Sequence, residues 1–210
     1  ISEIVVNGKP GNLSNYVTLY SEEINEITIK FNRYLDSCNY MFCCEFKNIL
    51  FIDTSNFNSF RVKSMSYMFS YCSALESIDL SNLDTSSVTD MSSMFEYCNL
   101  LTFLDLSSFD TSSVANMRYM FSDCESLISL GISKFDTSFV TDMRGLFYNC
   151  HSLKELDLSN FNTIYVIDMG FMFHYCYSLE SIFLSNFITS SVTDMRSRSE
   201  ERRVGKECRS

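Results

Sequence analysis

A single spacing of 26 residues dominates this sequence of 210 residues. Cysteines recur at this interval from Cys72 to Cys176, and phenylalanines do the same from Phe69 to Phe173. Methionines and valines repeat the interval as well. A fixed period of about 20 to 50 residues is typical of solenoids, in which each unit stacks on the next. The period therefore predicts a repeat solenoid of about five and a half units over residues 39–197.

Each unit has two halves with different apolar spacing, as residues 75–100 illustrate. Ile78 and Leu80 alternate with polar residues, which predicts a strand over 77–81. The apolar residues from Met91 to Cys98 follow the spacing i, i+3, i+4, i+7, which predicts a short helix over 91–97. Equivalent strands are expected over 103–107, 129–133, 155–159 and 181–185.

The expected fold class is α/β, a leucine-rich-repeat-like solenoid of period 26. Strands in a sheet lie about 4.8 Å apart, whereas packed helices lie about 8–10 Å apart. This mismatch predicts a curved stack, with parallel strands on the concave side and short helices on the convex side.

The two ends of the chain lack the repeat. Residues 1–38 combine a β-rich run at Ile4–Val6, an Asn-Gly turn and the alternating segment 27–31, which predicts an N-terminal β cap. Residues 198–210 interrupt a repeat unit and resemble the translation of a short-read sequencing adapter, so we expect an artefactual tail there.

The segments Phe109–Cys124 and Phe135–Cys150 resemble the tandem units of BspA-type leucine-rich-repeat surface proteins, whose pattern is LSNFDTSxVTDMxxMFxxC. The resemblance covers residues 27–197. It implies a secreted or cell-surface protein used for adhesion, with a protein or matrix ligand. An intracellular scaffold or regulatory repeat protein is the alternative from a different class, and a calcium-stabilised structural repeat is a further one.

Composition and motifs narrow the function classes. The 16 Lys and Arg against 26 Asp and Glu give a net charge of −10, without the basic footprint that nucleic acid requires. No apolar run is long enough for a membrane-spanning helix. The sequence contains neither a Ser-His-Asp pattern nor a nucleotide-binding loop. We expect His151 and His174 at the surface near helix ends, and neither is spaced from a cysteine as metal ligands are. We expect a non-enzymatic protein without a cofactor or a membrane-inserted segment.

The outward positions of the strands are the candidate binding surface. Most of them are small or polar, which leaves the sheet accessible. Phe103 and Phe183 break this polar pattern and could anchor a partner, since exposed aromatic residues often do. Together with the carboxylates of Asp79, Asp105 and Asp157, they define the predicted binding residues of a rigid acidic sheet.

Aspartates also fall in columns at the repeat spacing. Stacked carboxylates repel one another, so a calcium ladder would explain them. The alternative is local: Asp84 suits a turn and Asp90 suits a helix N-cap. The residue pattern lacks the glycine-rich loops of calcium β-rolls, and we expect no metal site.

The repeated cysteines have two possible roles. A disulfide ladder would suit a secreted protein. Disulfides need Cα atoms about 4.4–6.8 Å apart, closer than helices packed at about 8–10 Å would place them. We therefore predict free, buried thiols at Cys72, Cys98, Cys124, Cys150 and Cys176.

Overall fold

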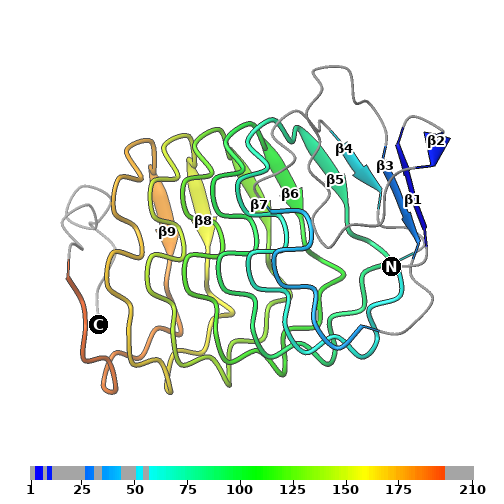
Figure 1. Ribbon diagram of the computed structural model, residues 1–210. Helices are drawn as coiled ribbons and strands as arrows, with labels where there is room; N and C mark the ends of the chain where they lie inside the picture. Colours follow the sequence, from blue (N-terminus) through cyan, green and yellow to red (C-terminus); the bar gives the residue numbers. More distant parts are fainter. Residues whose placement is uncertain are drawn as a thin grey trace.

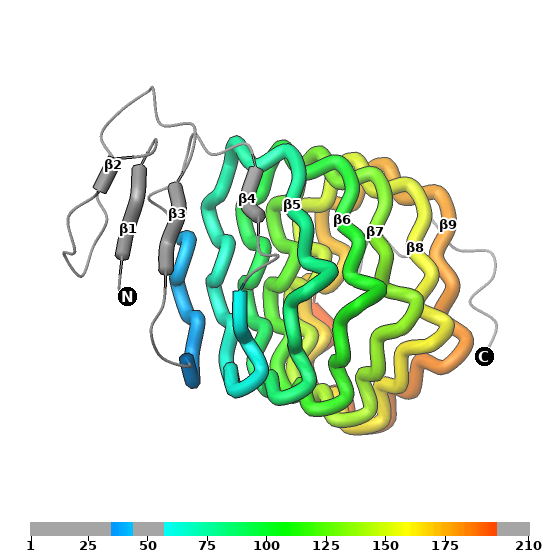
Figure 2. Tube along the Cα trace, turned by 90° about the vertical axis from the view of Figure 1, so that its right-hand side faces the viewer, coloured from blue at the N-terminus to red at the C-terminus, as the bar shows by residue number. Residues whose placement is uncertain are grey.

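The computed structural model describes residues 3–6, 9–10, 27–30, 35–43, 51–53 and 57–196, with side chains placed at 35–43 and 57–196. Over the repeat region, the chain winds into turns that stack side by side along one axis (Figures 1 and 2). Each full turn contributes one short strand and a series of tight turns.

Six strands of the described chain follow the repeat, and each is three residues long. They are β4 (Phe51–Asp53), β5 (Ser77–Asp79), β6 (Phe103–Asp105), β7 (Ser129–Gly131), β8 (Glu155–Asp157) and β9 (Ser181–Phe183). The pairs β4–β5, β6–β7 and β8–β9 are parallel, and paired residues lie 26 positions apart, as Phe103 and Ser129 do. The prediction of parallel strands is confirmed.

A second column of parallel contacts joins the turns away from these strands. Single bridges link Ser64 to Asp90 and continue with the same 26-residue step as far as Asp194. The first bridge, Ser37 to Ser64, spans 27 residues, which accommodates one inserted residue at the start of the array.

The N-terminal strands form a separate antiparallel sheet in the order β2-β1-β3. They are β1 (Glu3–Val6), β2 (Lys9–Pro10) and β3 (Ile27–Lys30). The boundaries at residues 38 and 197 stay predictions, and the expected tail at 198–210 lies outside the described residues.

Each repeat strand has three residues instead of the five predicted, and β5, β6 and β8 end on an aspartate. The side-chain Oδ1 of Asp79 accepts a hydrogen bond of 2.9 Å from the backbone N–H of Ser81. Asp105 and Asp157 make the same contact two residues ahead. This side-chain turn occupies the N–H that a longer strand would offer to its neighbour.

The prediction of short helices is wrong for the described residues, because 91–97 and its equivalents form turns. Ser93 and Tyr97 have φ angles of 54° and 61°, in the left-handed region. A left-handed residue at both places interrupts any right-handed helix. The two columns recur along the stack at Tyr67, Tyr71, Tyr119, Asp123, Gly145, Asn149, Phe171 and Tyr175.

Backbone hydrogen bonds in these segments alternate between local and inter-turn partners. Met94 N–H bonds to the carbonyl of Met91 at 3.3 Å, which closes a tight turn. The intervening Ser93 N–H reaches Arg118 of the next turn at 2.8 Å. The alternation satisfies the backbone donors without a helix while the helix-like apolar spacing still points inward.

The close inter-turn spacing removes the expected cause of curvature. Phenylalanine rings from Phe42 to Phe173 stack from turn to turn with centroids 5.4 to 6.0 Å apart. Both sides of the stack are joined by backbone hydrogen bonds, so helix packing at about 8–10 Å does not arise. The concave and convex sides that this mismatch predicted therefore have no basis here.

Threonines bridge the turns inside the stack. The Thr111 hydroxyl donates to the carbonyl of Asp136 at 2.9 Å and accepts from the N–H of Asp136 at 2.8 Å. The buried residues Thr85, Thr137 and Thr163 make the same pair of contacts. One side chain thus satisfies two backbone groups of the next turn.

The seven described cysteines are free and buried, so the predicted free thiols of the five repeat positions are confirmed. The helix-to-helix separation on which this prediction was based is wrong, because the described residues on this side of the stack form turns instead of helices. Each repeat thiol instead donates to a phenylalanine carbonyl of the preceding turn, as Cys98 does to Phe69 at 3.2 Å. Burial raises the pKa of Cys124 to about 12 and that of Cys98 well above its usual value.

Candidate interaction surfaces

The strand face consists of the outward positions of β5 to β9 and carries the residues predicted for binding. Phe103 and Phe183 are 56% and 44% exposed. Asp79, Asp105 and Asp157 are exposed in the third position of their strands. The structure therefore places all five side chains on one surface.

The two phenylalanines occupy different columns of this face. Phe103 lies opposite Ser129 in the pairing of β6 with β7, so a small side chain flanks its ring. Phe183 lies opposite Asp157 in the pairing of β8 with β9. The rings belong to turns three repeats apart, and they form two separate anchor points along the stack.

The three aspartates are exposed, and each also accepts hydrogen bonds from a serine two residues ahead. Hydrogen bonds from the backbone and hydroxyl of Ser81 lower the pKa of Asp79, and Ser107 has the same effect on Asp105. These carboxylates are consequently charged at neutral pH and held in fixed positions. The strand face therefore presents fixed negative charge.

Gly131, which has no side chain beyond its hydrogen atom, shapes the centre of the strand face. An added Cβ at Gly131 would lie 2.9 Å from Oδ1 of Asp105 and 3.3 Å from its Cα. Glycine thus lets the carboxylate of the neighbouring strand lie over β7. No other described turn has glycine at this position of its strand.

Two further columns of Asp and Asn use the same side-chain turn. The Oδ1 atoms of Asp84 and Asp90 accept from the backbone N–H two residues ahead at 3.0 and 2.9 Å. This confirms the local turn role of Asp84, whereas Asp90 caps a turn instead of a helix. Within the described ranges, no group of three or more His, Cys, Asp or Glu could hold a metal ion.

Sequence reasoning missed a second surface, which we call the turn face. It is built from the columns of residues 66, 67, 70, 71 and 73, in which small residues such as Ser66 and Ser70 are buried and the aromatic residues are half-buried or exposed. Tyrosines recur in it at residues 40, 67, 71, 97, 119, 148, 175 and 177. The sequence carried a usable signal, because Asp123, Gly145 and Asn149 in its columns tolerate left-handed φ better than most residues.

Aromatic rings on the turn face pack against one another. Tyr71 stacks on Tyr97 with centroids 4.5 Å apart. Nearer the C-terminus, His174 lies 3.8 Å from Tyr175, and His151 stacks on Tyr177 at 5.3 Å. The histidines were expected near helix ends and instead belong to this aromatic group.

Arg144 links four successive turns of the stack. Its Nε donates to the hydroxyl of Tyr119 at 3.1 Å. Its Nη1 lies 3.3 Å from Asp168 and 3.4 Å from Asp194, which belong to the next two turns. Gly170 lies in the same column as Arg144 and in the same turn as Asp168, where the absence of a side chain leaves space beside the two carboxylates.

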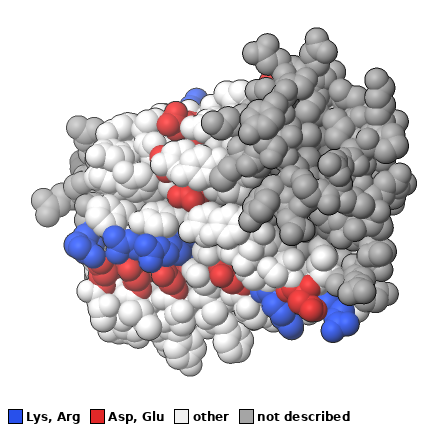
Figure 3. All heavy atoms as spheres, viewed as in Figure 1, with Lys and Arg blue, Asp and Glu red and all other residues white. Residues whose placement is uncertain are grey.

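Charged side chains form rows on this side of the molecule. Figure 3 shows a row of basic side chains beside a row of acidic ones. Arg144 and Arg196 both pair with Asp194, and these contacts lower the pKa of that carboxyl to about 2, chiefly through the hydrogen bonds of Arg196. Arg144 and Arg196 are thus both paired with carboxylates of the same chain.

The repeat region matches a known family model. That family is described as Mycoplasma protein of unknown function, DUF285, and the match covers residues 36–131 and 126–201. The chain belongs to the DUF285 family. Its matched region starts at the point where the column of bridges begins, with Ser37.

Two solved structures are similar to this DUF285 chain. A leucine-rich repeat protein of T. pallidum (TpLRR) has 16% identity and a TM-score of 0.45, covering 78% of this chain and 75% of that one. A leucine-rich repeat protein of Bacteroides ovatus has 18% identity and a TM-score of 0.37, covering 92% and 57%. Both scores are below 0.5, so neither supports an argument about function. No curated protein sequence matches the chain.

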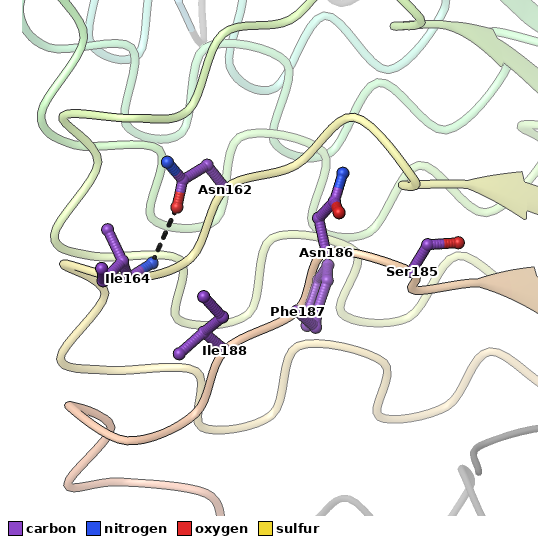
Figure 4. A pocket seen from close by; sticks show the side chains of 6 residues that line it. All are labelled: Asn162, Ile164, Ser185, Asn186, Phe187 and Ile188. Carbon is purple, nitrogen blue, oxygen red and sulfur yellow. Dashed lines mark hydrogen bonds between the residues drawn. The ribbon is translucent and has the colours of Figure 1, made fainter. Parts of the chain in front are cut away.

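A shallow hollow of about 420 Å³ lies at the last described turns of this DUF285 chain (Figure 4). Ile164 and Ile188 replace the Ser and Asp found at these positions in earlier turns. Asn162 preserves the side-chain turn by accepting from the N–H of Ile164 at 3.1 Å. The hollow is lined by Asn162, Ile164, Ser185, Asn186, Phe187 and Ile188.

Proposed function

We propose that this protein is a non-enzymatic interaction module, secreted or displayed on a cell surface, that binds a protein or matrix ligand through its strand face. The resemblance of its units to BspA-type surface proteins supports the adhesive role and the location. The observation that carries the proposed site is Phe103, a 56% exposed ring on a surface of small and acidic side chains.

The strand face is suited to binding because it is pre-organised. The turns below it are joined by backbone hydrogen bonds and by the threonine bridges. A surface that is already ordered loses little conformational entropy when a partner docks. Exposed phenylalanine then supplies apolar area, and the fixed carboxylates favour basic groups on the partner.

No helix in the described ranges is long and apolar enough to cross a membrane. Surface display is tested directly on the organism that encodes the protein. Antibody labelling of intact cells, or recovery of the protein from the medium, is the expected result. Labelling only after permeabilisation would favour the intracellular scaffold instead.

Binding is tested with purified matrix and cell-surface proteins in biolayer interferometry. The double variant Phe103→Ser, Phe183→Ser should weaken any measured affinity at least tenfold, because both apolar anchors are lost. Phe139→Ser is the matched control, since Phe139 is 65% exposed but lies outside the strand face. Equal affinities for the double variant and the unchanged protein would contradict the proposed site, provided that both have the same circular dichroism spectrum.

A further inference from the structure

A third surface, which we call the corner face, lies outside the strand face and the turn face. It is formed by one short segment in each of four successive turns: residues 84–89, 110–115, 136–141 and 162–167. Described turns stand on both sides of these four, at residues 58–63 and 188–193. The exposed side chains of the corner face therefore lie on the flank of the stack and not at either of its ends.

The side chains of the corner face change character halfway along the stack. In the first two segments, the outward positions carry only Asp, Ser, Thr and Ala. In the next two segments, four large apolar side chains stand at these positions, and they are between 40% and 65% exposed. We call these four residues the corner patch: Phe139, Ile164, Tyr165 and Ile167.

The fold does not require the apolar side chains of the corner patch. Ser112, which stands in the column of Ile164, donates a hydrogen bond of 2.6 Å from its hydroxyl to Asp110. Thr141, which stands in the column of Ile167, donates from its hydroxyl to a carbonyl of the preceding turn at 3.2 Å. Isoleucine makes neither bond, and an exposed isoleucine gains little from burial in return. The corner patch therefore replaces contacts within the chain by apolar surface that water reaches.

The four side chains of the corner patch belong to two turns that are joined directly. The N–H of Ile167 bonds to the carbonyl of Thr141 at 2.8 Å. Phe139 and Tyr165 occupy the same column of these two turns, and Ile164 precedes Tyr165 in the sequence. Exposed apolar side chains that gather in this way on a soluble protein mark interaction sites, whereas scattered ones do not.

A row of carboxylates continues the corner patch toward the N-terminus. Asp84, Asp110 and Asp136 stand in one column of the corner face, and all three are exposed. The backbone N–H two residues ahead donates to Oδ1 of each aspartate at 2.9 to 3.0 Å, which fixes the carboxylate. The four segments of the corner face contain no lysine, arginine or histidine. We call these three residues the aspartate row, and a partner that covers it must supply positive charge.

The spacing of these groups fits a helix that lies along the stack. Successive turns pair as parallel strands do, which places them about 4.8 Å apart. One turn of an α-helix rises about 5.4 Å, whereas side chains on one face of a strand are about 6.8 Å apart. Over the aspartate row, a helix therefore stays within about 1 Å of register, while an extended chain slips by about 4 Å. Basic side chains at i, i+4 and i+7 of the helix then match the aspartate row, and apolar side chains in its next turn reach the corner patch.

We propose that the corner face is a docking site for a basic amphipathic helix of another protein. The apolar side chains of the helix pack on the corner patch, and its lysine or arginine side chains lie beside the aspartate row. A second copy of this chain is a poorer fit, because it would place two aspartate rows in one interface without a basic group. The site is separate from the strand face, so it adds a second partner to the proposed function.

Fluorescence anisotropy with a labelled synthetic helix tests the proposal. The peptide is rich in alanine and carries lysine at i, i+4 and i+7 and leucine at i+8, i+11 and i+15, all on one side of the helix. Its control has the same composition, with lysine and leucine spread evenly around the helix. Titration with the full chain should give saturable binding of one peptide per chain, and the control peptide should bind at least tenfold more weakly.

A variant with the residues of the earlier turns locates the site. The triple variant Phe139→Ser, Ile164→Ser, Ile167→Thr gives the corner patch side chains that the first two segments already carry in the same columns. The fold accommodates these side chains there, and a matching thermal melt confirms that the variant folds. It should bind the peptide at least tenfold more weakly, because the apolar contacts are lost. Phe103→Ser is the matched control on the strand face and should leave the affinity for the peptide unchanged.

Asp110→Asn tests the aspartate row. Asparagine keeps the side-chain turn, as Asn162 shows in the same column by accepting from the N–H of Ile164 at 3.1 Å. The variant should bind the peptide about threefold more weakly in low-salt buffer and should differ less at high salt, since salt screens exposed charges. Asp105→Asn changes the net charge equally but lies on the strand face, so it should leave the affinity unchanged.

Four results of the titrations would overturn the proposal: absence of saturable binding, equal binding of the control peptide, an unchanged affinity of the triple variant, or equal effects of Asp110→Asn and Asp105→Asn. Sedimentation velocity of the chain without peptide adds a fifth. A dimer that the triple variant abolishes would assign the corner patch to a second copy. None of these results bears on the strand face, whose ligands are tested separately with Phe103 and Phe183.

Discussion

Substitution of Gly145 by alanine tests whether the turn face is built around close contact between Tyr119 and the next turn. Gly145 has a φ of 58°, where a non-glycine residue costs about 1–2 kcal/mol. An added Cβ would lie 2.1 Å from Cε1 and 2.2 Å from Cδ1 of the Tyr119 ring. The ring must therefore move when a methyl group is introduced.

Movement of the Tyr119 ring adds a second cost to the free energy of folding. The Tyr119 hydroxyl would lose the hydrogen bond from Arg144, which is worth about 0.5–1.5 kcal/mol. Added to the backbone term, the expected destabilisation by Gly145→Ala is about 1.5–3.5 kcal/mol. For a protein of this size, it corresponds to a fall in Tm of about 3–14 °C.

A second background separates the two contributions. Tyr119→Ser removes the ring, and serine is suited to this position because Ser93 occupies the same column with a φ of 54°. In this background Gly145→Ala should cost only the backbone term, about 1–2 kcal/mol. Urea denaturation followed by far-UV circular dichroism measures the free energy of unfolding for all four proteins.

The difference between the two backgrounds is the decisive quantity. We expect a coupling of about 1 kcal/mol, above the roughly 0.3–0.5 kcal/mol within which independent sites add. Equal costs in both backgrounds would refute the reasoning, because the ring would then not restrict the side chain at position 145. A cost near zero in both would refute the left-handed backbone as well.

Three further predictions concern the interior and the charged rows. Thr111→Val should destabilise the protein by about 2–4 kcal/mol in urea denaturation, because both backbone groups of Asp136 lose their buried partner. The control Thr141→Val removes one hydrogen bond at an exposed residue and should cost less than about 1.5 kcal/mol of folding stability. Equal costs for the two variants would contradict the bridging role of Thr111. Burial raises the pKa of Asp142, so protonation of this carboxyl is more favourable in the folded protein than in the unfolded chain. Asp142→Asn should therefore raise Tm at pH 7, and the gain should shrink as the pH falls toward this raised pKa. Asp105→Asn, at a carboxyl whose pKa is lowered, should give no such gain. The five repeat cysteines should be unreactive toward a thiol reagent in the folded protein, and all five should react after denaturation without reductant. If four of them stay unreactive after denaturation, they are joined by disulfide bonds.

The acidic side-chain turns imply a separate pH dependence. Hydrogen bonds lower the pKa of Asp79, Asp105, Asp110 and Asp157. Carboxyls of this kind stabilise the folded state above their unfolded pKa, and the contribution is lost as the pH falls through the lower folded value. We expect Tm to fall on acidification below about pH 4, measured in low-salt buffer. A Tm that stays constant down to pH 2 would show that these contacts contribute nothing.

Much of the candidate site could be placed from the sequence because strand alternation is a local property. The period located the strands β5 to β9, and the alternation of side chains put Phe103 and Phe183 on the exposed side. The turn face could not be placed in the same way. Its apolar spacing matches a helix, and one unit alone does not reveal whether its backbone donors bond within the segment or to the next turn.

The sequence by itself determined the stack, its 26-residue step and the identity of the buried columns, because these follow from which residues must leave water together. Only the tertiary structure decided how the Met-to-Cys segment folds. A neighbouring turn about one strand spacing away supplies backbone acceptors, as Arg118 does for Ser93, and makes the left-handed turns preferable to a helix. Contacts between turns, absent from any single unit, therefore select the local backbone.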